Sequence, residues 1–208
     1  MKKLIIIGDF PYYEEVLNIF ENSNQCNEYS FEKFVRVTEF DEVGSVEVFP
    51  GVFMPELPIG KDNYISIALD DIELKAKVIR YLRSIDSHFV TLVAKNALIF
   101  KDVEIGEGCI IGPNVVISFS SKLKNFVHLQ NNITIGNNVT ISDYCHINAN
   151  VFIGQNSSVG ESVTIHAGCI CIPNIVIGKN AVLGIGSVNL RNVKSGVTMF
   201  GNPAIEIL

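Results

Sequence analysis

Three of the four histidines lie in the second half of the chain at regular positions. His128 and His146 are eighteen residues apart and each precedes an aliphatic residue, whereas His166 follows one. Alternation along a strand would turn all three side chains outward. Such histidines serve as plain surface residues, as zinc ligands, or as contacts to the cosubstrate of an acyl transfer. Zinc is disfavoured because the acidic residues and paired histidine spacing of zinc sites are missing, so we expect no metal.

The segments that must position these histidines repeat every six residues. Each sixth position from Ile105 to Leu183 is Ile, Leu or Val, except Cys171, and a small or β-branched residue usually stands two positions earlier. This period predicts a parallel β-helix, in which three hexapeptides make one triangular coil of about eighteen residues. Residues eighteen apart would then stack on one face. An antiparallel sandwich would instead need variable strand lengths and hairpin turns, which the sequence lacks.

The first half has the pattern of a small α/β domain. Strands are predicted at 3–7, 34–37, 64–69 and 89–93, and helices at 13–20 and 72–85. This order implies a Rossmann-like, doubly wound parallel sheet, whose ligands bind at the carboxyl ends of the strands, near Gly8 to Tyr13. We therefore expect an α/β domain at 1–95 and a β-helix domain at 96–208, with the tail 193–208 capping the coils.

Composition narrows the classes of protein that the sequence can represent. The chain has 208 residues, of which 48% are hydrophobic and 18% charged, and this excludes intrinsic disorder. A net charge of -6 disfavours nucleic acid as a partner, and no apolar run approaches the roughly 18 residues of a membrane span. Four of the five cysteines occupy inward β-helix positions and are expected to be core thiols, whereas Cys26 lies in a polar loop. We expect a cytoplasmic protein with reduced thiols.

Both halves also carry stretches typical of a known family: LIIIG at 4–8, IGNNVTISDYCH at 135–146, IPNIVIG at 172–178, and LGIGSV at 183–188 running to GNPA at 201–204. The chain resembles the left-handed β-helix sialic-acid and amino-sugar acetyltransferases, and most of all the bacterial enzymes that N-acetylate nucleotide-linked 4-amino-4,6-dideoxy sugars. The resemblance implies a homotrimer with acetyl-CoA between adjacent β-helices. Its substrate would be a dTDP- or UDP-linked amino sugar, and its product would enter O-antigen or glycan assembly.

The resemblance also implies roles for individual residues. Asn137 and His146 fall at the catalytic positions. Positions that contact acetyl-CoA correspond to His146, Ala167, Gly168, Gly184, Ile185 and Gly186. Positions that contact the nucleotide sugar correspond to Gly8, Phe10, Pro11, Tyr12, Glu39, Asp41 and Ala68.

Two departures from the family pattern affect the expected chemistry. The family has a histidine base and an acidic neighbour where this chain has Asn137 and Asn138, and the loop after Gly8 lacks the usual glycines. Asparagine cannot accept the proton. The enzyme is then active without a base at this position, or the chain is an engineered variant, or it is an inactive nucleotide-sugar-binding trimer. Sugar O-acetylation is a further alternative, although an alcohol needs stronger base assistance than an amine.

Overall fold

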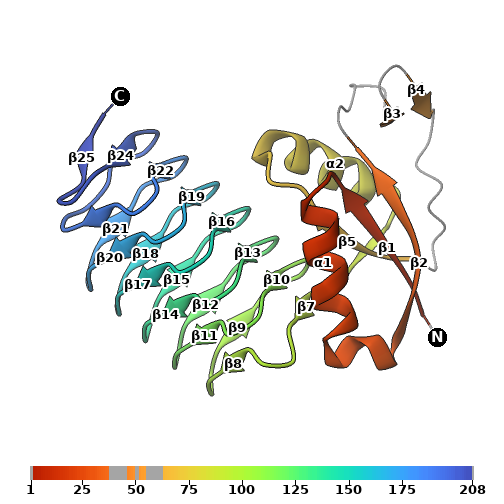
Figure 1. Ribbon diagram of the computed structural model, residues 1–208, viewed down its shortest axis with the longest axis horizontal. Coiled ribbons are helices and arrows are strands. Elements are labelled where there is room, and N and C mark those ends of the chain that lie inside the picture. The colour runs from red at the N-terminus through yellow and green to blue at the C-terminus, as the bar shows by residue number, and fades with distance from the viewer. Residues whose placement is uncertain (1, 38–45, 50–51, 55–62, 208) are drawn as a thin grey trace. The chain divides into compact units, whose positions relative to one another are not determined.

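The computed structural model describes residues 2–37, 46–49, 52–54 and 63–207, and the chain divides into two compact units, Met1–Leu92 and Val93–Leu208 (Figure 1). None of the helices in those ranges has the length and apolarity needed to cross a bilayer.

The first unit contains a four-stranded parallel sheet with the strand order β2-β1-β5-β6. Its strands are β1 (Lys2–Gly8), β2 (Tyr29–Arg36), β5 (Asn63–Ala68) and β6 (His88–Phe89). The helices are α1 (Tyr12–Glu21), α2 (Ile72–Ser84) and the short 3-10 helix η1 (Asn24–Asn27), and a separate hairpin pairs β3 (Val46–Phe49) with β4 (Val52–Met54).

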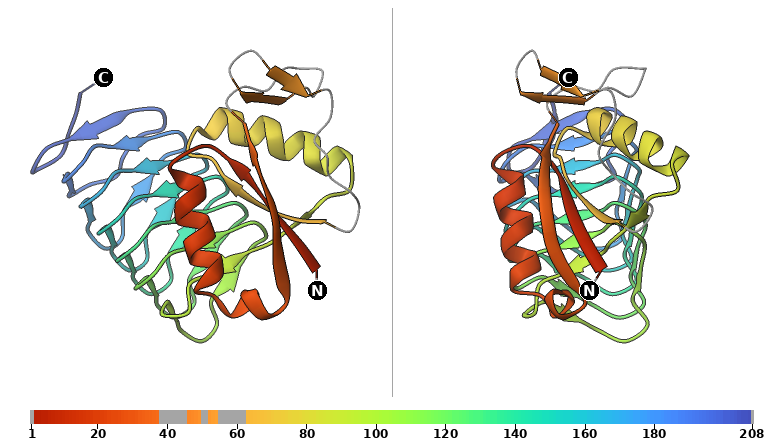
Figure 2. Two further views of the ribbon diagram at one scale, coloured as in Figure 1. Left: turned by 45° about the vertical axis from the view of Figure 1, so that its right-hand side comes forward. Right: turned by 90° about the vertical axis from the view of Figure 1, so that its right-hand side faces the viewer.

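The apolar run of β1 explains why this strand is central. Leu4, Ile5, Ile6 and Ile7 are all fully buried, as expected for a parallel strand covered on both faces. The α1 crossover leads from β1 to β2, and the α2 crossover leads the opposite way, from β5 to β6. Because parallel crossovers are right-handed, α1 and α2 lie on opposite faces of the sheet (Figure 2).

The predicted α/β fold is confirmed, but one predicted strand is wrong. Residues 89–93 do not form a single strand: His88–Phe89 pairs with β5, whereas β7 (Leu92–Val93) pairs within the second unit. The apolar pattern runs through both segments because each is partly buried, so periodicity alone does not reveal the change of sheet. The six-residue repeat accordingly begins before Ile105, with β7 and β8 (Leu98–Ile99).

The second unit is a prism of stacked coils with three sheet faces, consistent with a left-handed β-helix (Figure 1). The first face contains β7, β10 (Ile110–Ile111), β13 (His128–Leu129), β16 (His146–Ile147), β19 (Thr164–Ile165), β22 (Val182–Leu183), β24 (Thr198–Phe200) and β25 (Ile205–Glu206). The second contains β8, β11 (Val116–Ile117), β14 (Thr134–Ile135), β17 (Phe152–Ile153), β20 (Ile170–Cys171) and β23 (Val188–Asn189). The third contains β9 (Glu104–Ile105), β12 (Lys122–Leu123), β15 (Thr140–Ile141), β18 (Ser158–Val159) and β21 (Val176–Ile177).

The repeated aliphatic positions form the core of this prism. Ile135, Ile153 and Cys171 illustrate one ladder, in which partners eighteen residues apart pair in parallel and are fully buried. At the corners, residues such as Asn138 and Asn156 adopt a positive φ, which asparagine tolerates better than most residues. Their side chains also bond to each other, from Nδ2 of Asn138 to Oδ1 of Asn156 at 3.1 Å.

The tail packs on the last coils of the β-helix. β24 continues the first face beside β22 and β25 returns antiparallel to it, while Met199 and Ala204 join the hydrophobic core. These two apolar residues therefore cover the carboxyl-terminal end of the ladder.

Candidate functional site

The carboxyl ends of β1 and β5 form the switch point of the parallel sheet, because their crossovers run in opposite directions. Gly8 and Ala68 are paired there, and a Cβ on Gly8 would overlap the carbonyl group of Ala68. The amide of Asp9 donates to that same carbonyl oxygen at 3.2 Å. Open α/β sheets bind their ligands in this crevice, so Gly8 and Ala68 lie where the sequence places the substrate.

Phe10, Pro11 and Tyr12 lie in the loop that leads from this edge into α1. Phe10 is exposed, and Pro11 precedes the first helical residue, Tyr12. Burial, together with the nearby Asp70 carboxylate, raises the pKa of Tyr12 to about 12. Its phenol therefore keeps its proton at neutral pH and can act as a donor.

A cation that no sequence motif predicts lies at the same edge. Arg36 is the last residue of β2 and pairs with Gly8, and its Nε lies 2.8 Å from Oδ1 of Asp9. The predicted acidic positions Glu39 and Asp41 lie outside the described residues. No sequence spacing marks this arginine, because only the register of β2 against β1 brings it to this edge.

His128 and His146 stack on the first face, as their spacing predicts. The strands pair them directly, and their ring centroids lie 4.6 Å apart. They are not plain surface residues, because only 1% of His128 and 4% of His146 is exposed. A side chain that points outward from the strand is not necessarily exposed. His128 lies in its ladder between the bulky side chains of Ile110 and His146, which cover it.

A corner of the prism joins the first and second faces and carries the residues expected to contact the cosubstrate. In successive coils it consists of Ala149–Asn150, Ala167–Gly168 and Ile185–Gly186, linked by bonds from Gly168 to Ala149 and from Gly186 to Ala167, each 2.9 Å. Gly168 and Gly186 have positive φ, and a Cβ on Gly186 would meet no atom within 4 Å. This column, termed the first corner, therefore presents open backbone along two coils.

In one coil of the first corner, a backbone amide donates to a side chain. The N–H of Ala149 donates to Oε1 of Gln130, 3.1 Å away. Ala167 and Ile185 repeat this backbone position one and two coils later. Neighbouring side chains above Gln130 in the same ladder are Asn148 and His166, whose Nδ2 and Nδ1 lie 3.4 Å apart.

Asn137 lies at a different corner, between the second and third faces. Its side chain is exposed, and its carbonyl accepts from the amide of Asn156 at 2.9 Å. Its neighbour Asn138 belongs to the asparagine ladder of the turn and has a structural role. Nine residues separate Asn137 from His146, which is half of an eighteen-residue coil, so one copy of the chain does not bring the two together.

Comparisons with known proteins agree with this architecture. A family model described as the GMPPB C-terminal domain matches residues 93–184, and no curated protein matches the chain. PerB from Caulobacter crescentus, solved with CoA and GDP-perosamine, is 20% identical, with a TM-score of 0.84 over 98% of this chain and 96% of its own. The acetyltransferase domain of PglB from Neisseria gonorrhoeae FA1090, solved with acetyl coenzyme A, is 19% identical, with a TM-score of 0.71 over 99% of both chains.

The chain shares the fold of these two proteins, a parallel α/β sheet followed by a hexapeptide β-helix. WeeI from Acinetobacter baumannii AYE shares it, with 23% identity and a TM-score of 0.70 over 99% of this chain and 100% of that one. Another structure with this fold is a histidine-to-asparagine variant of perosamine N-acetyltransferase from Caulobacter crescentus, in complex with CoA and GDP-perosamine, at 21% identity and a TM-score of 0.83. That protein therefore holds both ligands with an asparagine in place of a histidine.

The β-helix buries its four thiols, and the described residues of the chain gather no three metal-ligating side chains. Burial raises the pKa of Cys171 to about 12, so this thiol stays protonated and unreactive at neutral pH. Cys109, Cys145 and Cys169 are also buried, whereas Cys26 is partly exposed.

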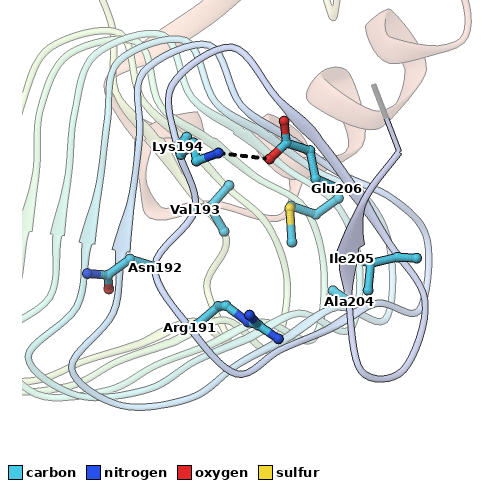
Figure 3. Close-up of a pocket in the computed structure, with 8 residues that line it drawn as sticks. Arg191, Asn192, Val193, Lys194, Ala204, Ile205 and Glu206 are labelled. Carbon is cyan, nitrogen blue, oxygen red and sulfur yellow. Dashed lines mark hydrogen bonds and ion pairs between the residues drawn. The ribbon is translucent and has the colours of Figure 1, made fainter.

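A pocket of about 300 Å³ lies at the carboxyl-terminal end of this β-helix (Figure 3). Val193, Met199 and Ala204 give it apolar walls, and Lys194 and Glu206 form an ion pair of 3.4 Å beside it. None of the residues predicted for the catalytic or cosubstrate site lines this pocket, which belongs to the cap of the coils.

Proposed function

We propose that the protein transfers the acetyl group of acetyl-CoA to the 4-amino group of a nucleotide-linked 4-amino-4,6-dideoxyhexose. Two observations support this function. The fold matches, over 98% of the chain, a protein solved with CoA and GDP-perosamine. In addition, the first corner exposes backbone at Gly168 and Gly186, and the parallel sheet has a switch point at the carboxyl ends of β1 and β5.

Acetyl-CoA lies along the first corner in this proposal. The open glycines at 168 and 186 admit an extended pantetheine arm close to the backbone. The amides of Ala167 and Ile185, which repeat the position at which Ala149 donates to a side-chain oxygen, would donate to its carbonyl groups. His146 lies on the adjoining first face and would contact the acetyl group.

Asn137 reaches this acetyl group only from a second copy of the chain. We therefore propose a closed homotrimer, in which the corner that carries Asn137 meets the first corner of the next copy. The two corners border the second face on either side, so three second faces turned toward a common axis bring them together.

The side chains of the second face support this arrangement. Its outward ladder is Leu98, Val116, Thr134, Phe152, Ile170 and Val188. Strands and turns from 96–100, 114–120, 132–138, 150–156, 168–174 and 186–190 contain no charged residue, although 18% of the chain is charged.

The third face differs sharply from the second in charge. It carries ion pairs between Lys122 and Glu104 at 2.8 Å and between Lys179 and Glu161 at 2.9 Å. The charged third face is suited to exposure to water. The second face is apolar and free of charge, with Ile170 43% exposed, and is suited to contact with another copy.

The acetyl transfer itself needs little from the protein beyond positioning. The neutral amine attacks the thioester carbonyl carbon, a C–N bond forms, the C–S bond breaks, and CoA leaves as a thiolate that takes up a proton. The proton of the amine passes to water or to His146. The amide of Asn137 cannot take up this proton. Its oxygen instead accepts a hydrogen bond from the amine and orients it. Positioning can supply more acceleration than the roughly 10²–10⁴-fold of a general base, so a slow enzyme without a base is feasible.

The nucleotide sugar occupies the carboxyl edge of the parallel sheet, near Gly8, Phe10 and Ala68. The family resemblance implies a dTDP- or UDP-linked sugar, whereas PerB was solved with a GDP-linked one, so all three nucleotides need testing. An O-acetyltransferase needs a base to activate the alcohol, and Asn137, which is not a base, occupies the position of that base. An N-acetyltransferase is therefore favoured.

Release of the CoA thiol tests the proposed reaction. The protein is incubated with acetyl-CoA and 4-amino-4,6-dideoxyhexoses linked to dTDP, UDP or GDP, and thiol formation is followed by a chromogenic reagent. We expect sugar-dependent thiol release with at least one amino sugar, and none with the corresponding 4-hydroxy sugar. Absence of thiol release with every sugar, while nucleotide still binds, would favour an inactive sugar-binding protein.

A further inference from the structure

The loop after β1 offers few amide groups to the phosphates of a nucleotide. In glycine-rich loops, free N–H groups at the start of a helix hold the diphosphate. Here the amide of Asp9 donates to Ala68, the amide of Phe10 donates to Oδ1 of Asp9 at 2.7 Å, and Pro11 has no N–H. The usual backbone cradle is therefore largely occupied.

The first turn of α1 does not replace that cradle. The amide of Tyr13 donates to the carbonyl of Asp9, and the amides of Glu14 and Glu15 donate to that of Pro11. Glu14 and Glu15 also place two carboxylates in the first turn. These carboxylates offset the partial positive charge of the helix N-terminus and repel a second anion, so this turn is a poor phosphate site.

Arg36 brings a positive charge to the same edge from β2. It pairs with Gly8, so it lies directly beside the switch point rather than elsewhere along the sheet. Oδ1 of Asp9 accepts from its Nε at 2.8 Å, and 39% of the arginine side chain is exposed. Asp9 and Arg36 thus stand on neighbouring strand ends at the predicted nucleotide site.

We propose that Arg36 binds the diphosphate of the nucleotide sugar, in place of the backbone cradle, and that Asp9 is a positioning residue for it. This inference rests on the proposed function and names the residue that recognises the anionic part of its substrate. Asp9 holds the guanidinium at Nε, one of its five N–H donors. The two terminal nitrogens carry the other four, in a fork that matches phosphate oxygens.

An ordinary surface ion pair would behave differently. Such pairs contribute little to stability, so removing one that lies far from the ligand should leave ligand binding unchanged. The matched pair on this sheet is Lys3 with Glu32, 3.1 Å apart, in the amino-terminal halves of β1 and β2. Lys3 therefore provides a control with the same type of contact at the opposite edge.

Calorimetric titration of the full-length protein with dTDP, UDP and GDP tests the assignment. For the diphosphate that binds wild type best, Arg36→Gln should raise Kd by about 10- to 100-fold, the loss expected for charge-assisted hydrogen bonds. The same variant should reduce the affinity for the matching nucleoside monophosphate by a smaller factor. Lys3→Gln should leave both affinities unchanged, and acetyl-CoA should bind all variants equally.

Two variants of Asp9 test its positioning role. Asp9→Asn keeps an oxygen that accepts from Nε but removes the competing charge, so diphosphate affinity should rise by about 3- to 10-fold and fall more steeply with added salt. Asp9→Ala removes the acceptor and should weaken binding. The proposal is overturned if Arg36→Gln binds the diphosphate as tightly as wild type, or if wild type binds none of the three. Nucleotide binding that depends on Arg36 without any acetyl transfer would instead refute the proposed reaction and leave this assignment intact.

Discussion

Asn137 and His146 lie half a coil apart on opposite sides of the same β-helix. Asn137 is at the corner between the second and third faces, whereas His146 is on the first face beside the first corner. A single copy therefore presents the two residues of the proposed catalytic site at separate places on its surface. The proposed chemistry needs both, and this makes assembly of several copies part of the function rather than an accessory to it.

The charge-free second face should control assembly. Ile170→Glu places a carboxylate on this face, and we expect it to shift the mass from three copies of 22.9 kDa, about 69 kDa, to a single copy. Val176→Glu is the matched control, because Val176 is similarly exposed but belongs to the third face. Multi-angle light scattering measures both masses. Equal masses for the two variants would show that the second face is not the interface.

The absence of a base at residue 137 should be visible in the pH dependence. Asn137→His introduces a group that accepts a proton only when neutral, so kcat/KM should gain a limb that rises through a pKa of about 6.5. We expect a gain of about 10-fold or more at pH 8 with folding unchanged. Gln155→His, at the equivalent corner one coil later, should keep the wild-type profile. A profile for Asn137→His identical to wild type would place this residue outside the proton path.

The contact between Gly8 and Ala68 should limit substitution at the switch point. Gly8→Ala forces a methyl group against the carbonyl of Ala68, and we expect the free energy of unfolding to fall by about 1–3 kcal/mol. Urea denaturation followed by circular dichroism measures this change. A loss below about 0.5 kcal/mol would contradict the close approach of β1 and β5 at this end.

Thiol reactivity should separate Cys26 from the other four cysteines. A thiol with a pKa of about 12, as burial gives Cys171, has almost no thiolate at pH 8 and does not alkylate. Iodoacetamide should therefore add one label to the native protein and five in urea, as measured by mass spectrometry. Rapid labelling of Cys171 in the native protein would mean that the β-helix opens far more readily than its packing indicates.

The six-residue period predicted the β-helix well because each rung depends on one local rule. A single aliphatic residue per strand, such as Ile135 or Ile153, points inward, and a tight turn follows it. The two helices of the first unit were predicted within one or two residues, since Asp71 caps α2 through a 2.9 Å bond to the amide of Leu74. Local patterns of this kind need no knowledge of distant partners.

Properties that depend on register between distant segments were not predictable. Burial of His146 reflects its neighbours in space, not its alternation along the strand. Arg36 reaches the substrate edge only through the pairing of β2 with β1. Leu92 looked like the continuation of a strand that in fact ends at Phe89, because both segments are apolar while the pairing partner changes.

Mixed assemblies test most directly whether neighbouring copies share one site. Asn137→Trp fills one proposed half-site and Ala167→Trp fills the other, and each variant alone should be inactive in thiol release. When the two are co-expressed and assemble at random, about one interface in four combines an unchanged Asn137 with an unchanged Ala167 from the next copy. We predict recovery of about a quarter of the wild-type thiol release. Continued inactivity of mixed assemblies of confirmed composition would contradict a site shared between copies.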